Sequence, residues 1–247
     1  MLRVERAEEG VEVWTIDRPH AANALDSVTI SALEVEVARI AATPVRVVVV
    51  TSAARATGRS VFVAGADLKE LAAVADAQTA RAFSERMVSL LARFGVLPTV
   101  FVAAVDGDAL GGGCEFLTAF DLVVAAKTAR FSFRQARMGV GTGWGGATRL
   151  PRRVGLGAAK RLLFTAMHFD ADEALRVGFV DEVVDAALPR ALALASEIAE
   201  GSFDAIAALK GNLNDAAVLA PAESCAREIE RFVFTWAGPD HQAVRKR

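Results

Sequence analysis

The chain has 247 residues, of which 53% are hydrophobic and 23% charged, so it can bury a sizeable core and lies far from disordered compositions. Its 28 basic residues nearly balance its 30 acidic ones, which argues against nucleic acid as the main partner. No apolar stretch is long enough to cross a bilayer, and the N-terminus lacks the apolar segment of a secretory signal. We therefore expect a cytoplasmic protein with no membrane partner, and a reducing compartment suits its two widely spaced cysteines.

Strand and helix patterns alternate along the first three quarters of the chain. Alternating residues predict a hairpin over 2–7 and 11–17, and apolar residues at helical spacing predict a helix over 27–42. Continuous apolar runs predict buried strands, which we expect over 45–51, 99–105, 121–126 and 131–133. The order of strand, glycine loop and helix occurs twice, so the pattern indicates an α/β fold.

After residue 184 the pattern is almost wholly helical. Amphipathic helices are expected over 186–200, 203–218 and 221–236. We therefore expect an α/β core over residues 1–185 and a C-terminal helical element over residues 186–247, which would lie on the core or on a neighbouring subunit.

Two loops made of small residues each follow an apolar segment and lead into a helical pattern. The first is VAGADLK, residues 63–69, and the second is ALGGGCE, residues 109–115. Small residues let a ligand approach the main chain, and three consecutive glycines are costly at the start of a helix. Taken together, the loops offer a pair of backbone amides that can stabilise negative charge on one carbonyl oxygen.

These motifs resemble the crotonase, or enoyl-CoA hydratase/isomerase, superfamily. The resemblance begins at Asp17-Arg18-Pro19 and Asn23-Ala24-Leu25, and it continues through FVAGADLKEL, ALGGGCEF, Asp121, GWGGATRL and ALRVGFVDEVV. It implies a crotonase-like spiral of repeated β-β-α units, a homotrimer or a dimer of trimers, and an acyl-CoA thioester as substrate.

The resemblance also assigns roles position by position. Ala66 and Gly112 would supply the two oxyanion-hole amides, and Glu115 would be catalytic. Coenzyme A would lie along a segment made largely of backbone, formed by Ala22, Ala24, Ala64, Asp67, Leu68 and Lys69. The acyl pocket would include Gly111, Arg134, Gly143 and Trp144. No cofactor beyond the coenzyme A of the substrate is expected, and the three histidines show no metal-ligand spacing.

The chain departs from the pattern at the second catalytic position. Typical hydratases of this family carry a second glutamate 20 residues after the first, where this chain has Gln135. Glutamine can orient a water molecule or a carbonyl group, but it cannot exchange a proton at neutral pH. The standard mechanism with two glutamates is therefore not expected.

Three functions remain open. The first is a lyase of the enoyl-CoA hydratase/isomerase family that works through a stabilised enolate with a single catalytic Glu115. The second is a decarboxylase of malonyl-type thioesters, such as methylmalonyl-CoA or ethylmalonyl-CoA, because loss of carbon dioxide gives the same enolate without a base to remove a C–H proton. The third belongs to another class: an acyl-CoA-binding protein that has kept the scaffold without the chemistry.

Overall fold

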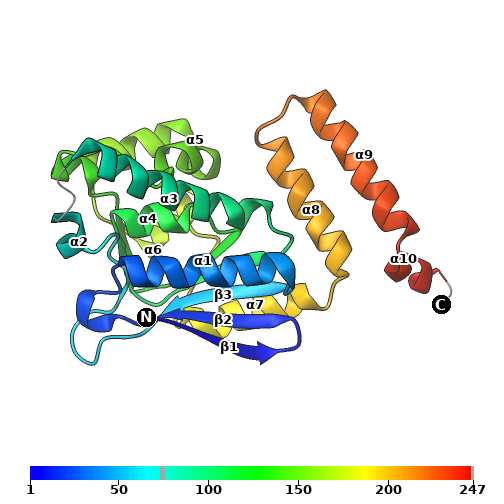
Figure 1. Ribbon diagram of the computed structural model, residues 1–247, viewed down its shortest axis with the longest axis horizontal. Helices are drawn as coiled ribbons and strands as arrows, with labels where there is room; N and C mark the ends of the chain where they lie inside the picture. Colours follow the sequence, from blue (N-terminus) through cyan, green and yellow to red (C-terminus); the bar gives the residue numbers. More distant parts are fainter. Residues whose placement is uncertain (73–75, 246–247) are drawn as a thin grey trace.

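The computed structural model describes residues 1–72 and 76–245, and its centre is a six-stranded sheet (Figure 1). The strand order is β1-β2-β3-β5-β7-β10, with only the β1–β2 pair antiparallel. The strands are β1 (Leu2–Glu8), β2 (Val11–Ile16), β3 (Val47–Ser52), β5 (Val100–Val105), β7 (Leu122–Ala126) and β10 (Glu182–Val184).

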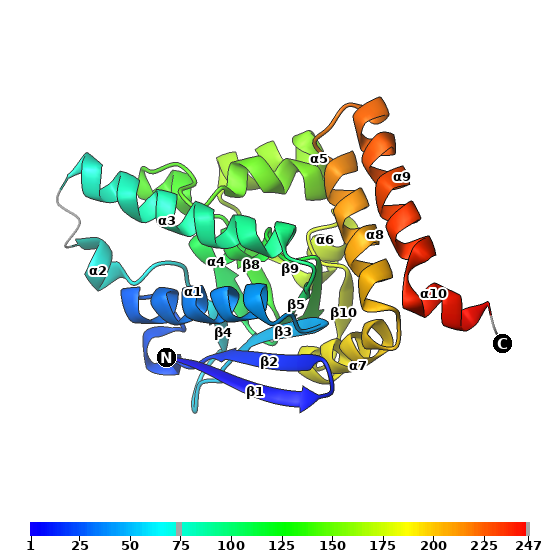
Figure 2. The same cartoon turned by 45° about the vertical axis from the view of Figure 1, so that its right-hand side comes forward.

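Both faces of this sheet are covered, which explains the continuous apolar runs in its strands. On one face, Val48, Val50 and Phe101 pack with helix α1 (Ser27–Ala42) and helix α3 (Ala77–Val96). On the other face, Val47 and Val49 pack against helix α7 (Ala187–Ala199) (Figure 2).

A second, smaller sheet lies beside the first and has the order β4-β6-β8-β9. Its strands have only two or three residues each: β4 (Val61–Val63), β6 (Asp108–Leu110), β8 (Arg130–Ser132) and β9 (Phe169–Asp170). One order of elements repeats along the chain: a strand of the large sheet, then a strand of the small sheet, then a helix. The helices that close these units are α2 (Leu68–Ala72) with α3, then α4 (Gly112–Leu117), then α5 (Gly146–Thr165) after the 3-10 helix η2 (Gln135–Met138). The expected succession of β-β-α units is thus present.

The elements named from the sequence form close to their expected bounds. Helix α1 has the predicted ends, because Asp26 accepts a hydrogen bond from Thr29 N–H at its start and Pro44 follows its end. Strands β4, β6, β9 and β10 were not predicted, nor were helix α5, helix α6 (Ala171–Arg176) and helix α10 (Pro239–Val244).

The C-terminal helices fall into two groups. Helix α7 belongs to the body, because its buried Ala187, Ala191 and Ala195 pack on the sheet. Beyond it, helix α8 (Phe203–Ala216), helix α9 (Pro221–Ala237) and helix α10 (Pro239–Val244) project from the body, and α9 contacts chiefly α8 and α10 (Figures 1 and 2). The projecting part therefore begins near residue 200, within the helical element that the sequence analysis expects over 186–247. Within the described residues, no helix has the length and apolar character needed to span a membrane.

Candidate active site

One cavity of about 720 Å³ gathers the residues that the sequence analysis assigned to the site. It opens between the loops that precede α2 and α4, the loop before α1, and η2. Every residue assigned to the site lines it: Ala22, Ala24, Ala64, Ala66, Asp67, Leu68, Lys69, Gly111, Gly112, Glu115, Arg134, Gln135, Gly143 and Trp144.

The first free amide is the backbone N–H of Ala66, which has no acceptor in the described chain, and the pairing of Ala66 with Leu25 sets its direction. Leu25 forms a parallel bridge with Ala66, in which Leu25 N–H donates to Gly65 O at 2.8 Å and Asp67 N–H donates to Leu25 O at 3.1 Å. A residue bridged in this way directs its own N–H and C=O to the opposite side. Ala66 N–H accordingly points away from Leu25, and it has no acceptor within residues 1–72 and 76–245.

The second free amide belongs to Gly112, the first residue of α4. The first-turn N–H groups of a helix have no partner within the helix, and Gly112 N–H has none elsewhere in the described chain. Gly111 enters the helix with a φ of 54°, a conformation that favours glycine. A Cβ atom on Gly65 would lie 3.0 Å from Gly112 N, so the two loops touch where their free amides lie.

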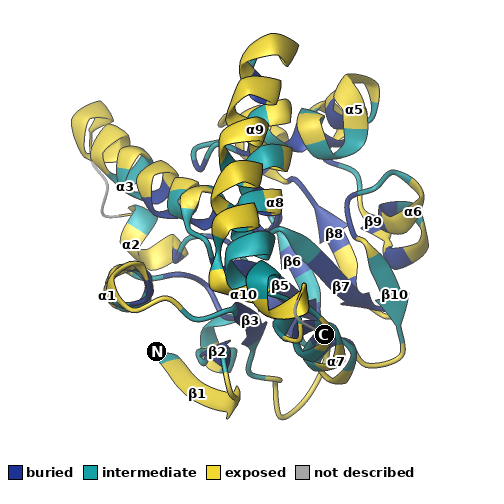
Figure 3. Cartoon of the chain, turned by 90° about the vertical axis from the view of Figure 1, so that its right-hand side faces the viewer, coloured by how far each residue is buried: buried dark blue, intermediate teal, exposed yellow. Residues whose placement is uncertain are grey.

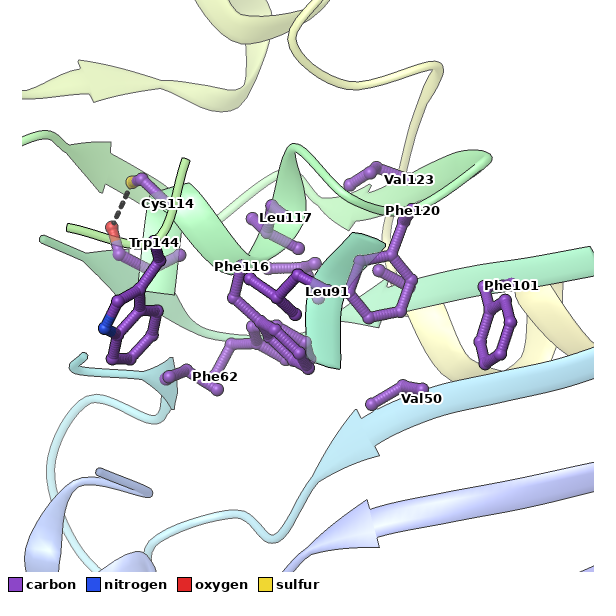
Figure 4. Close-up of a cluster of buried hydrophobic side chains, with 14 of the residues drawn as sticks. Val50, Phe62, Leu91, Phe101, Cys114, Phe116, Leu117, Phe120, Val123 and Trp144 are labelled. Atoms are coloured by element: carbon purple, nitrogen blue, oxygen red, sulfur yellow. Dashed lines mark hydrogen bonds between the residues drawn. The ribbon is translucent and has the colours of Figure 1, made fainter. Parts of the chain in front are cut away.

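Helix α4 is held firmly in the core below these amides. Figure 4 shows Cys114, Phe116 and Leu117 among the buried side chains, with Cys114 Sγ donating to Ala109 O at 3.0 Å. Burial raises the pKa of the Cys114 thiol, so it stays protonated. The opposite side of the helix presents Glu115 to the cavity.

Glu115 is 2% exposed, and its carboxylate accepts hydrogen bonds from four N–H groups. Oε2 accepts from Trp144 N–H at 2.8 Å and from Gly146 N–H at 3.0 Å. Oε1 accepts from Gln135 Nε2 at 2.7 Å and, at the longer distance of 3.3 Å, from Gly143 N–H. Four donors match the acceptor capacity of an ionised carboxylate. The backbone of the glycine-rich segment 143–146 therefore forms a cradle for this charge.

Gln135 is 8% exposed and is oriented by Glu115, because its Nε2 donates to that carboxylate. Its Oε1 has no hydrogen-bond partner among the described residues. The two positions that the sequence analysis paired, 115 and 135, are thus in direct contact, and Gln135 keeps an acceptor available.

The loop before α1 is shaped by its own polar groups. Ala22 and Asn23 have φ values of 53° and 52°, and buried Asn23 stabilises this turn by accepting from Arg18 N–H at 2.9 Å and donating to Val61 O at 2.7 Å. Arg18 also contacts the Asp67 carboxylate at 3.0 Å. Lys69 N–H and the Arg18 guanidinium lower the pKa of Asp67, which keeps this carboxylate ionised at the edge of the cavity.

Several residues that shape the site were not predicted. Phe83 and Ser84 reach the cavity from α3, and Ser84 Oγ donates to Gly143 O. Arg149 supports the cradle from behind, where its Nη2 donates to Trp144 O at 2.5 Å. No sequence period marks these residues, since their roles depend on contacts between segments far apart in the chain.

Chemically, this arrangement can hold a polarised carbonyl group above a carboxylate. Two free amides on adjoining loops can together bind an oxygen on which negative charge develops. Glu115 is the acidic side chain placed beside them, and Trp144 covers Gly112 so closely that a Cβ there would lie 2.8 Å from the indole ring. Within the described chain, no group of three or more His, Cys, Asp or Glu side chains is placed to hold a metal ion.

Comparison with known proteins gives consistent results. The family model for enoyl-CoA hydratase/isomerase matches residues 6–245. A short-chain-enoyl-CoA hydratase of Clostridium acetobutylicum is 40% identical, covering 72% of this chain and 67% of its own. A crotonyl-CoA hydratase of Syntrophomonas wolfei is 33% identical, covering 95% of this chain and 90% of its own. The crystal structure of an enoyl-CoA hydratase from Bacillus anthracis superposes with a TM-score of 0.92 at 28% identity, covering 99% of this chain and 96% of that one.

Proposed function

Because the chain belongs to the enoyl-CoA hydratase/isomerase family, we propose that it adds water to the double bond of an enoyl-CoA, with Glu115 as its only proton-transferring side chain. One observation supports this proposal: the free amides of Ala66 and Gly112 lie on adjoining loops, in one cavity with a buried and hydrogen-bonded Glu115. The thioester carbonyl oxygen would accept from both amides, and the coenzyme A portion would lie along the loop segments of Ala22–Ala24 and Ala64–Lys69.

The chemical steps follow from the placement of Glu115. Its carboxylate removes a proton from water, the water oxygen bonds to the β-carbon, and the electron pair of the double bond moves toward the thioester oxygen as an enolate. The amides stabilise this enolate. Glu115, now protonated, returns its proton to the α-carbon, and the carboxylate is restored. One group thus acts first as base and then as acid, and the net change is addition of water.

The two oxygens of Glu115 divide these tasks. Oε2 is held by two short backbone hydrogen bonds, whereas one of the two contacts to Oε1 is the long one from Gly143 N–H. Oε1 would therefore take up the proton, and the long contact from Gly143 N–H would give way to it. Gln135, whose Oε1 lacks a donor, would accept a hydrogen bond from the attacking water and orient it.

Decarboxylation of a malonyl-type thioester is the second candidate, and the presence of Gln135 favours it. The bond between the α-carbon and the carboxylate breaks, carbon dioxide leaves, and the electron pair forms the enolate held by Ala66 and Gly112. Water then supplies the proton to the α-carbon. No side chain has to remove a proton at any step, so a glutamine at position 135 is no obstacle.

The deciding experiment offers purified protein crotonyl-CoA and, separately, methylmalonyl-CoA, and follows loss of the conjugated double bond and release of carbon dioxide. We expect hydration, and we expect Glu115→Gln to lower kcat by about 10²- to 10⁴-fold, because it removes the proton-transferring group. Rapid hydration that survives this substitution would contradict the role of Glu115. Carbon dioxide release without hydration would establish the decarboxylase, and tight acyl-CoA binding without either reaction would establish the non-catalytic binder.

Gln135→Glu supplies a matched test of the second position. A carboxyl group there adds a second proton-transferring group beside Glu115, so we expect hydration of crotonyl-CoA to become faster. The measurement is kcat on crotonyl-CoA, with butyryl-CoA binding as the control for an intact site. Unchanged or lower kcat with unchanged binding would mean that the pocket is shaped for a different reaction.

We further propose that the protein assembles as a homotrimer or a dimer of trimers. The support is the projecting part of the chain, where much of α8 and α9 is exposed (Figure 3). Large apolar residues are among the exposed ones, including Leu213, Phe232 and Phe234. Such a surface is typical of a protein interface.

A further inference from the structure

The cradle of Glu115 depends on the peptide groups of residues 143–146 having one particular orientation. For their N–H groups to converge on a carboxylate, their carbonyl groups must be directed elsewhere. The peptide group that joins Trp144 to Gly145 lies between the two peptide groups whose N–H bonds, those of Trp144 and Gly146, donate to Glu115 Oε2. Its carbonyl, Trp144 O, accepts from Arg149 Nη2 at 2.5 Å. Arg149 therefore holds the far side of the peptide chain that binds the carboxylate.

The same guanidinium also binds the helix that carries Glu115. Arg149 Nε donates to Thr118 Oγ1 at 3.0 Å, and Nη2 donates to the backbone oxygen of Glu115 at 3.3 Å. Thr118 Oγ1 in turn donates to that backbone oxygen at 2.6 Å. One side chain from the first turn of α5 thus joins the cradle loop to α4, and it fixes the distance between carboxylate and amides.

The surroundings of Arg149 fit a residue that joins the cradle loop to α4 better than a residue that forms an ordinary ion pair. It has no carboxylate within salt-bridge distance in the described chain, and it is partly buried. Burial lowers the pKa of Arg149, and the nearby Glu115 charge opposes that effect. Gly145, with a φ of 80°, passes so close that a Cβ there would lie 2.7 Å from Nη1. The loop is therefore built against the guanidinium.

We propose that Arg149 is a positioning residue for Glu115: it holds the amides of Gly143, Trp144 and Gly146 in the orientation that binds and aims the carboxylate. Arg149 lies outside the set of residues that line the cavity, so it acts through Glu115 and not on the substrate. Its effect on turnover rests on the proposed function, whereas its effect on the cradle does not.

The first test needs no turnover. Hydrogen exchange of the amides of Gly143, Trp144 and Gly146 is compared in the native protein, Arg149→Met and Arg152→Met. Arg152 is the matched control, because it lies on the same helix and makes no hydrogen bond to the cradle. We expect these three amides to exchange at least about tenfold faster in Arg149→Met, because their acceptor is no longer fixed. Arg152→Met should leave them unchanged.

The second test measures turnover of whichever thioester the native protein accepts. Arg149→Met should lower kcat by about 10²-fold with little change in KM, because a displacement of about 1 Å in a catalytic group has an effect of this size. Arg149→Ala should regain part of its kcat when guanidinium ion is added, and Arg152→Ala should not respond.

Three results would overturn the proposal. They are unchanged exchange of the cradle amides in Arg149→Met, equal acceleration of exchange throughout the molecule, and unchanged kcat in an active protein. Should Arg149→Met fail to fold, Arg149→Lys and the guanidinium response of Arg149→Ala still decide the question. A native protein that turns over no thioester would refute the proposed function. The hydrogen-exchange experiment would still test the positioning role of Arg149, because it needs no turnover.

Discussion

The glycines of the site differ in what a side chain at each position would meet. A Cβ on Gly113 would lie 1.9 Å from Val63 O, whereas one on Gly141 would have no atom within 4 Å. A Cβ on Gly146 would lie 2.6 Å from Glu115 Cγ. Of these, Gly113 has no room to adjust, because the atom it meets belongs to the backbone of β4. The run of three glycines thus serves packing at Gly113 and access to the amide at Gly112.

We therefore expect Gly113→Ala to reduce the free energy of unfolding by about 2 to 4 kcal/mol, because α4 must move away from β4. Gly141→Ala, where space is open, should change it by less than about 0.5 kcal/mol. Urea unfolding of both variants measures the difference. Equal stability of the two variants would show that α4 can move at little cost.

At the residue scale, sequence motifs could predict the site's members but not all of their contacts. The spacing of Glu115 and Gln135 indicated a pair, and the structure places their side chains 2.7 Å apart. The three backbone donors to Glu115 were not predicted, because any residue type carries an N–H and only the fold directs it. Arg149 lies in the segment GWGGATRL, yet two of its acceptors are backbone carbonyl groups, which no residue type reveals.

At the scale of elements, helix α8 is attached to the body through Lys210. Its Nζ donates to Phe94 O at 2.5 Å, to Thr99 O at 2.7 Å and to Asp121 Oδ2 at 2.8 Å. Burial lowers the pKa of Lys210 and raises that of Asp121, and each charge offsets the effect on the other. The contact fixes the direction in which α8 leaves the body.

Lys210→Met leaves the partly buried Asp121 carboxylate without its ammonium partner, so we expect a loss of about 3 kcal/mol in the free energy of unfolding. Lys160→Met, on the exposed side of α5, is the control and should change stability little. Urea unfolding followed by circular dichroism measures both. A loss below about 1 kcal/mol would show that water replaces the ammonium group.

Predictability at this scale depended on an uninterrupted apolar period. The 20-residue helix α5, which contains Pro151 and a non-helical Gly155, was not predicted. Helices of 13 to 17 residues, such as α7 and α9, carry several turns of apolar pattern and were predicted nearly to their ends. Strands β4 and β6 have three residues each, too few for a period to be seen, and they exist because they pair with each other. The sequence left two places open for the C-terminal helices, the core or a neighbouring subunit, because an apolar stripe does not identify the surface it packs on. The structure places α7 on the sheet.

At the scale of the whole molecule, the projecting helices leave large apolar side chains exposed. Phe234 on α9 is 64% exposed and Leu213 on α8 is 72% exposed. Assembly would bury this surface, and each buried side chain of this size contributes about 1.5 to 3 kcal/mol. The projecting part is thus better suited to an oligomer than to an isolated chain.

Light scattering with size-exclusion chromatography should give a mass three or six times the 26.1 kDa of one chain. Phe234→Glu places a charge in the apolar surface and should shift the protein toward smaller species, while the control Glu230→Gln should keep the native mass. A native mass of 26 kDa at micromolar concentration would refute the assembly proposal.

The strand order of the large sheet determines when the sheet can form during translation. Neighbours in the sheet are distant in the chain: β3 ends at Ser52 and pairs with β5 from Val100, and the edge strand β10 begins at Glu182. During translation, a ribosome that has released both amide loops has yet to supply η2, the cradle and the last sheet strand. Native pairing of this kind is slow and leaves apolar strands uncovered in the meantime. The nascent chain therefore cannot complete its large sheet until its last third, which carries β10, has emerged, and its apolar strands stay open to aggregation until then.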